Sequence, residues 1–380
     1  MKVFFRTIHL YLSLLAGFVI LLSCLTGAVL VFEKELQETF NHNRYFVQPQ
    51  EKYALELEQL VKAVQVQVPH AKVISIKIDR NPTRTTELSY HIPERQQNEK
   101  KEADKKETKA NRKIAFVNPY TAQIIELYSY RNTFFYQMLA LHRWLWAGAT
   151  GKLIVGTSSL IFLFILITGI ILWIPKTNKV VKQRLKIKWN ANWKRLIHDF
   201  HIILGFYTAI FLFIFAFTGL AWSFKWFNNG IYVVTNSSVE PLKPPRSEIQ
   251  SNKNKIDFDE VFKRIKTVTP DASSLTILAP QDSILTYTVN VLPINNIENA
   301  IDTYYIDQYT GRVLSIIKFS DKNLGQRVRS TFKPIHIASV YGIYSKSVGF
   351  IVCLLGATFP ITGIIMWINR RGKNKKAGFK

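Results

Sequence analysis

The sequence predicts an α-helical membrane protein: a four-transmembrane-helix bundle made by tandem duplication of a two-helix unit, with two small α+β domains outside the membrane. Three observations indicate this fold class. The chain has four long stretches without charged residues, and each has a histidine near its start and a Thr-Gly pair near its end. The separations from histidine to glycine are 18, 27, 18 and 27 residues. Because they alternate, the two halves of the chain read as copies.

The repeated pattern joins each histidine to the next Thr-Gly pair. The four instances are His9 with Thr26-Gly27, His142 with Thr168-Gly169, His201 with Thr218-Gly219, and His336 with Thr362-Gly363. The first and third histidines are 192 residues apart, and the second and fourth are 194 residues apart. Small residues let membrane helices approach closely. We therefore interpret the Thr-Gly pairs as packing residues at helix crossings.

The four stretches without Asp, Glu, Lys or Arg hold 21 to 23 residues each. At the helical rise, this length suffices to cross a hydrocarbon core of about 30 Å. Only a helix satisfies its own backbone hydrogen bonds within a single segment there. The predicted transmembrane helices are residues 10–32, 152–174, 202–224 and 348–368.

The distribution of basic residues predicts the orientation. The short segments 1–9, 175–201 and 369–380 hold 2, 8 and 6 Lys and Arg against a single acid, Asp199. In the long segments 33–151 and 225–347, acids nearly balance the bases. By the positive-inside rule, both termini and the middle loop are cytoplasmic. The net charge of +24 therefore indicates contact with anionic membrane lipid and not nucleic-acid binding.

Each long segment has the pattern of one amphipathic helix followed by four strands. In the first, the helix is expected at 53–68 and the strands at 73–78, 87–92, 114–117 and 124–127. In the second, the helix is expected at 258–268 and the strands at 275–278, 286–292, 303–306 and 312–317. Residues 94–113 are almost all charged or polar, so we predict a mobile loop there.

This topology predicts how deep in the membrane each histidine lies. His9 and His201 fall near the cytoplasmic face, whereas His142 and His336 fall near the outer face. A parallel two-fold relation between the halves brings these residues together as two pairs. Two facing imidazoles are the axial ligands that six-coordinate b-type haem requires. We therefore predict two haem b groups per chain, with His198, three residues before His201, as an alternative inner ligand.

Small residues recur at matched distances after the histidines. Ser13 and Gly205 lie four residues after the inner histidines, and Gly148 and Gly342 lie six residues after the outer ones. Without large side chains, these positions are expected to let a macrocycle approach the backbone.

The four histidines are also compatible with roles other than haem ligation. A single histidine at a membrane interface is more often a polar anchor than a ligand. Zinc is disfavoured because Cys24 and Cys353 are not at metal-ligand spacing from any of the four histidines. Covalent c-type haem requires a Cys-x-x-Cys-His motif, which the sequence lacks. The two cysteines are expected to be buried packing thiols, with a haem-thiolate role as the lesser alternative.

Several motifs together resemble the PepSY-associated transmembrane family. They are Leu141-His142-Arg143-Trp144-Leu145, Asp199-Phe200-His201 with Leu204-Gly205, and Pro334-Ile335-His336 with Ile361-Thr362-Gly363. The turns Asn118-Pro119-Tyr120-Thr121 and Asp307-Gln308-Tyr309-Thr310-Gly311 resemble the Asp-Pro-x-Thr-Gly turn of the PepSY domain. The sequence departs from the family at Asn118 and Ala122, and at Leu10-Tyr11, where the family tends to have Arg-Trp.

The resemblance implies a protein of the bacterial inner membrane, related to haem-containing ferric-siderophore reductases. Electrons are then expected from a cytoplasmic donor or a quinol, since the sequence has no flavin or nicotinamide motif. They would reduce a ferric siderophore or another ferric chelate and release Fe(II). One alternative is a non-enzymatic membrane protein whose PepSY-like domains bind or restrain a peptidase or another envelope partner. Haem transport is a further alternative.

Overall fold

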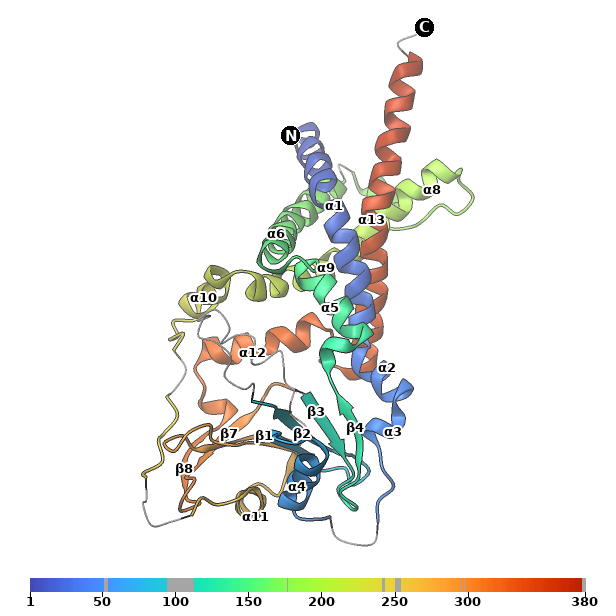
Figure 1. Cartoon of the computed structure of the whole chain (residues 1–380). Helices are drawn as coiled ribbons and strands as arrows, with labels where there is room; N and C mark the ends of the chain where they lie inside the picture. Colours follow the sequence, from blue (N-terminus) through green and yellow to red (C-terminus); the bar gives the residue numbers. More distant parts are fainter. Residues whose placement is uncertain are drawn as a thin grey trace. The chain divides into compact units, whose positions relative to one another are not determined.

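The computed structural model describes residues 1–50, 54–93, 113–175, 177–240, 243–249, 254–294, 296 and 298–377 (Figure 1). The predicted mobile loop, residues 94–113, lies outside the described residues except for Lys113. The chain divides into two compact units. The helical unit comprises residues 1–33, 134–234 and 331–380, and the sheet unit comprises residues 34–133 and 235–330.

In the described part of the chain, four helices are long and apolar enough to cross a membrane. They are Lys2–Val31 (α1), Gly148–Trp173 (α6), Trp193–Ser223 and Gly342–Arg371, the last within α13 (Gly342–Ala377). Helix α1 packs against α6 and α13, and α6 packs against the third span. The first and third spans begin before the uncharged stretches, because a helix continues into the interface while its charged side chains reach water. His9 and His201 therefore lie within helices.

The third span is built from three consecutive helical segments. They are α8 (Trp193–Asp199), the π-helical turn η3 (Phe200–Leu204) and α9 (Gly205–Ser223). A π-helical turn is rare and re-aims the side chains around it, which is why such turns are frequent at functional sites. This one contains His201.

His142 and His336 lie on two short helices that precede the second and fourth spans. These are α5 (Phe134–Trp144) and α12 (Leu324–His336). The connections that follow turn sharply: Gly148 and Gly342 have φ values of 53° and 59°. Glycine adopts this left-handed conformation without steric cost. Backbone geometry therefore accounts for these two glycines, which we expected to make room for a macrocycle. The helical unit also contains α7 (Asn178–Arg184) and α10 (Lys225–Val234).

In the described residues of the sheet unit, eight strands form one antiparallel sheet in the order β4-β3-β2-β1-β5-β6-β7-β8. The strands are Lys72–Asp79, Thr86–His91, Lys113–Val117, Ile124–Tyr128, Ala272–Leu278, Tyr287–Pro293, Asp302–Ile306 and Val313–Ile317, numbered β1 to β8. Strands from both predicted α+β segments therefore lie in one sheet. Strand β1 pairs with β5, from Ser75 opposite Leu278 to Asp79 opposite Ser274.

Two helices cover one side of this sheet (Figure 1). Helices α4 (Leu57–Gln67) and α11 (Phe258–Val268) bury their apolar stripes in a core that both halves of the chain share. Strand β2 alternates between buried and half-buried residues, the pattern of a strand with one face against a core. The shorter elements are α2 (Glu33–Phe40), α3 (His42–Tyr45), η2 (Tyr130–Asn132) and η4 (Phe319–Asp321).

The two covering helices cap each other. The Asp259 carboxylate accepts hydrogen bonds from the backbone N–H groups of Leu57 and Glu58, at 2.6 and 3.1 Å. In return, the Glu58 carboxylate accepts one from the backbone N–H of Phe258 at 3.2 Å. Carboxylates stabilise helix N-termini, and a good cap contributes about 1 kcal/mol. These contacts join segments about 200 residues apart in the sequence.

The predicted turn at Asp307 is held by its carboxylate. It accepts hydrogen bonds from the backbone N–H of Tyr309 at 2.9 Å and of Thr310 at 2.7 Å. Burial alone would raise the pKa of Asp307, but these hydrogen bonds outweigh it and the pKa is lowered. Gly311 closes the turn with a φ of 66°. In the first half, Ala122 adopts a φ of 57° at the corresponding position, despite its Cβ.

Candidate functional site

Each of the four histidines is held by the Thr-Gly pair of another helix in the same half of the chain. The Nδ1 to threonine Oγ1 distances are 2.9 Å for His9 and Thr168, 3.1 Å for His142 and Thr26, 2.8 Å for His201 and Thr362, and 3.1 Å for His336 and Thr218. The arrangement is reciprocal: the first histidine of each half contacts the second Thr-Gly pair of that half, and the second histidine contacts the first Thr-Gly pair. We call a Thr-Gly pair that contacts a histidine in this way a histidine seat.

The glycine of each seat leaves space for the imidazole ring. A Cβ added at Gly27, Gly169, Gly219 or Gly363 would lie 3.3, 3.4, 3.2 or 3.6 Å from Cε1 of the facing histidine. Three of these distances are tighter than ordinary carbon contacts. The predicted packing role of the Thr-Gly pairs therefore has a specific partner, because a histidine ring from another helix lies close to each glycine.

The threonines also determine which histidine nitrogen carries the proton. Each hydroxyl donates to the carbonyl four residues earlier in its own helix, at 2.6 Å for Thr26, 2.9 Å for Thr168, 2.7 Å for Thr218 and 3.0 Å for Thr362. With its hydrogen used in this way, the oxygen accepts a hydrogen bond from Nδ1–H of the facing histidine. The hydrogen-bond network thus assigns the proton to Nδ1 and leaves the Nε2 lone pair available for a metal.

His142 and His336 form a closely packed pair. Their ring centres are 6.1 Å apart. Each Nδ1 has a second acceptor, the Ser23 carbonyl at 3.0 Å for His142 and the Phe215 carbonyl at 2.9 Å for His336. The Trp222 ring centre is 5.3 Å from that of His336. Imidazoles on opposite sides of one metal need their nitrogens about 4 Å apart, twice a metal–nitrogen bond of about 2 Å, and the ring spacing accommodates this.

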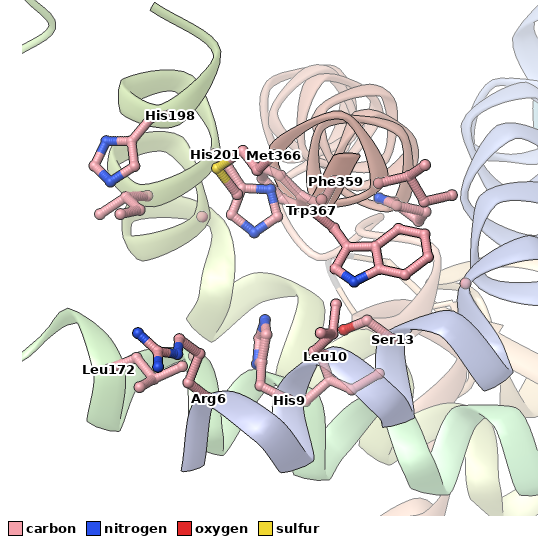
Figure 2. Close-up of a pocket in the computed structure, with 18 of the residues that line it drawn as sticks. Arg6, His9, Leu10, Ser13, Leu172, His198, His201, Phe359, Met366 and Trp367 are labelled. Atoms are coloured by element: carbon pink, nitrogen blue, oxygen red, sulfur yellow. The ribbon is translucent and has the colours of Figure 1, made fainter. Parts of the chain in front are cut away.

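His9 and His201 project from α1 and η3 into a cavity of about 620 Å³ (Figure 2). This volume is within the usual range of small-molecule and cofactor sites, about 300–1,000 Å³. Most of the lining is apolar or aromatic, and includes Ile20, Phe162, Ile165, Phe206, Phe359, Trp173 and Trp367. Ser13 and Gly205 also line the cavity, and a Cβ at Gly205 would meet no atom within 4 Å. The expected open space is therefore present beside these two small residues.

His198 lines the same cavity but lacks a seat. Its side chain is 46% exposed, and its Nδ1 lies 3.3 Å from the Asp199 carboxylate. His201, by contrast, is half-buried and hydrogen-bonded to Thr362. Between the two predicted alternatives for the inner ligand, the geometry favours His201.

Each histidine pair offers two nitrogen atoms, one Nε2 from each ring, as donors to a metal. In the described part of the chain, no group of three or more His, Cys, Asp or Glu side chains is arranged to hold a metal ion. Cys24 and Cys353 are buried free thiols, as expected. A two-nitrogen donor set fits a metal whose other four positions are filled by a macrocycle, as in haem. The apolar cavity and the glycines of the seats also fit such a group.

Sequence reasoning missed two sets of residues here. The four threonines of the seats were assigned to packing, although their separations from the preceding histidines match between the two halves of the chain. Their partners are the histidines of neighbouring helices, which sequence spacing alone does not reveal. Basic residues at the mouth of the cavity had been used only to predict the orientation of the chain in the membrane. They are Arg6, Lys194 and Arg370.

Comparison with known proteins places the chain in a family. Residues 6–370 match a family model described as the PepSY-associated TM region. No curated protein matches the chain.

Proposed function

The chain belongs to the PepSY-associated TM family, and from this premise we propose that it is a di-haem b-type electron-transfer protein of the bacterial inner membrane. It takes electrons from a cytoplasmic donor or a quinol and delivers them to a ferric chelate, such as a ferric siderophore, on the outer side. Each electron reduces one Fe(III) to Fe(II), which hard oxygen ligands hold less tightly, and the iron is released. The protein is thus a ferric-siderophore reductase.

The observation that carries this proposal is the repeated histidine seat. Four histidines share one hydrogen-bonding pattern, in which the threonine oxygen accepts from Nδ1–H and the neighbouring glycine admits the ring. A histidine that only anchors a helix in the interface does not need its ring orientation and tautomer fixed. An axial ligand does, because second-shell hydrogen bonds of this kind orient the ring and raise its basicity.

The two pairs form between the halves of the chain. His142 and its seat belong to the first half, and His336 and its seat belong to the second. His9 and His201 are related in the same way across the cavity. Matching seats at matching separations support a tandem duplication, in which each cofactor is held by one ligand from each copy.

Haem b, when bound, supplies a one-electron Fe(III)/Fe(II) couple at each pair. The chain's own residues hold the ligands in place and keep water away. Buried Ala16, Ile20, Ile165, Leu212 and Val352 form an apolar core in the bundle. The basic short segments support cytoplasmic termini. In the proposed orientation, the His9–His201 pair is on the donor side and the His142–His336 pair is on the acceptor side.

The proposal is tested with the full chain in proteoliposomes. A donor is enclosed, a ferric siderophore is added outside, and Fe(II) is trapped with a coloured chelator. We expect wild type and His91→Ala, a control outside the pairs, to produce Fe(II), and His336→Ala to produce none above background. Equal rates in wild type and His336→Ala would overturn the proposal.

The same preparation separates the two alternatives. A haem transporter would lose its haem to an acceptor apoprotein placed outside, whereas the reductase retains it during turnover. A module that only binds or restrains a peptidase would produce no Fe(II) and would need no haem for that binding.

A further inference from the structure

The mouth of the His9–His201 cavity is lined by basic side chains from three helices. They are Arg6 on α1, Lys194 and His198 on α8, and Arg370 on α13. All four are exposed, whereas His9 and His201 are half-buried. Figure 2 shows Arg6 and His198 on the same side of the cavity. We refer to Arg6, Lys194 and Arg370 as the basic rim.

Other basic residues of this region already have partners. The Lys2 ammonium donates to the Ile174 carbonyl at 2.6 Å, and Arg184 donates to the carbonyls of Leu172 and Trp173 at the end of α6. Arg195 pairs with Asp199 at 2.8 Å.

The basic rim is different. Within the described ranges, none of its three side chains forms an ion pair, and Lys194 only lies over the adjacent Trp193 ring, 5.7 Å from its centre. Three cations therefore converge on one cavity without a protein counter-ion.

The cavity is polar at one end and apolar at the other. Along α1 it extends from exposed Arg6 to buried Ile20, about 21 Å at the helical rise. Ile165 and Ala209, which also line it, are buried. A ligand that fills this space needs an apolar body with anionic groups at one edge.

The basic character of the mouth recurs in both halves. Arg6 lies three residues before His9, and His198 lies three residues before His201. Residues three apart share a helix face, so each ligand histidine has a basic residue beside it at the mouth. His198 therefore corresponds to Arg6 as a basic residue at the mouth of the cavity, which is a different role from coordinating the metal.

We propose that the basic rim binds the carboxylates of the cavity's ligand, so that a tetrapyrrole dicarboxylate is seated with its carboxylates at the mouth and its apolar edge inside. This inference rests on the proposed function. Charge-assisted hydrogen bonds from guanidinium groups to carboxylates are short, directional and stronger than neutral ones. They fix which edge of the macrocycle faces the mouth. The phosphate of an anionic lipid headgroup shares this chemistry and is the competing occupant.

The test compares haem with haem dimethyl ester, whose carboxylates are blocked. The full-length apoprotein, made under haem limitation, is titrated with each ligand in nanodiscs of neutral lipid, and binding is followed by the Soret band. We expect wild type to bind the ester about 10- to 100-fold more weakly than haem at one of its two sites. In the double variant Arg6→Gln/Arg370→Gln, haem binding at that site should weaken to the level of the ester.

Ester binding by the double variant should equal that of wild type, which also shows that the variant is folded. Arg371→Gln is the matched control, because Arg371 adjoins Arg370 but lies over the Trp367 ring, 4.6 Å from its centre. Equal wild-type affinities for haem and ester would overturn the inference and leave the proposed function standing. So would a double variant that keeps the wild-type haem affinity in neutral nanodiscs and differs from wild type only when the titration is repeated in nanodiscs that contain anionic lipid. Wild type that binds neither ligand would overturn both.

Discussion

The His9–His201 and His142–His336 pairs share one construction but have different surroundings. In both pairs, a threonine oxygen accepts a hydrogen bond from each histidine Nδ1–H, and a glycine leaves space for each imidazole ring. The His9–His201 pair faces a cavity of about 620 Å³ with a basic mouth. The rings of His142 and His336 lie 6.1 Å apart, beside Trp222, and each has a backbone carbonyl as a second acceptor.

The difference teaches that the orientation of the histidine rings and the access to them are set by separate residues. Orientation comes from the seats, which are alike in all four places. Access comes from the residues around them, which differ between the pairs. Under the proposed function, the open, basic site is the one that meets the electron donor, and the tightly packed site beside Trp222 holds its two histidines more rigidly.

The largest effect is expected from removing a ligand. His9→Gly and His336→Gly should each lower the haem content from two to one per chain, because one axial nitrogen is lost. Added imidazole should restore the second haem in His9→Gly, because the native His9 side chain faces the cavity. It should restore much less haem in His336→Gly. Haem per chain, measured with and without imidazole, tests this. Equal rescue of both variants would show that the two sites are equally accessible.

Removing a threonine hydroxyl should have the next largest effect. Thr362→Val takes away the Nδ1 acceptor of His201 and should weaken haem binding about 10- to 100-fold, the usual cost of losing a second-shell partner. Thr218→Val should cost less, because the Phe215 carbonyl still accepts from His336. Haem dissociation rates and midpoint potentials report both effects.

Serine provides the control for the threonines. Thr362→Ser and Thr218→Ser keep the hydroxyl and should behave like wild type. If the valine and serine variants were indistinguishable, the hydroxyl would have no role in fixing the ligand.

Filling a seat should have a smaller effect that again differs between the pairs. A Cβ at Gly219 would lie 3.2 Å from the His336 ring, whereas one at Gly363 would lie 3.6 Å from the His201 ring. Gly219→Ala should therefore strain the packed pair by about 1–3 kcal/mol and shift its midpoint potential. Gly363→Ala should leave the potential of its pair close to wild type. The reverse order would contradict the seat geometry.

The smallest effect on the pairs is expected from the sheet unit. Asp307→Asn should destabilise this unit by about 1–3 kcal/mol at neutral pH, because it weakens the carboxylate's hydrogen bonds. The folded pKa of Asp307 is lowered, so its contribution is present above the unfolded pKa of about 4 and is lost as the pH falls through the folded value. Hydrogen exchange of the sheet unit against pH measures this. An altered haem spectrum would contradict the assignment of the site to the helical unit.

The sequence allowed a good prediction of local structure and a partial prediction of the site. Uncharged runs and two-residue alternation depend on neighbours in the chain, so the strands and the ends of the spans were placed within about three residues. The spans begin four to nine residues earlier than predicted, because the helices continue past the uncharged runs. The pairing of β1 with β5 joins segments about 200 residues apart, and no local pattern encodes it. The prediction of one α+β domain in each long segment did not include this pairing.

The histidines show the same limit. Their repeat predicted which residues belong together, and the structure brings His142 beside His336 and opens His9 and His201 onto one cavity. The reciprocal seats were not predicted, because a contact such as His9 with Thr168 depends on how helices pack and not on spacing. That the four histidines ligate haem stays a prediction.

The most direct measurement is an absorption spectrum of the detergent-purified protein, oxidised and dithionite-reduced, with haem counted per chain as the pyridine haemochrome. Paired histidine ligation predicts a sharp α-band on reduction and about two b-type haems per chain. A colourless protein, after expression with an adequate haem supply, would contradict haem ligation by the histidine pairs and with it the electron-transfer function.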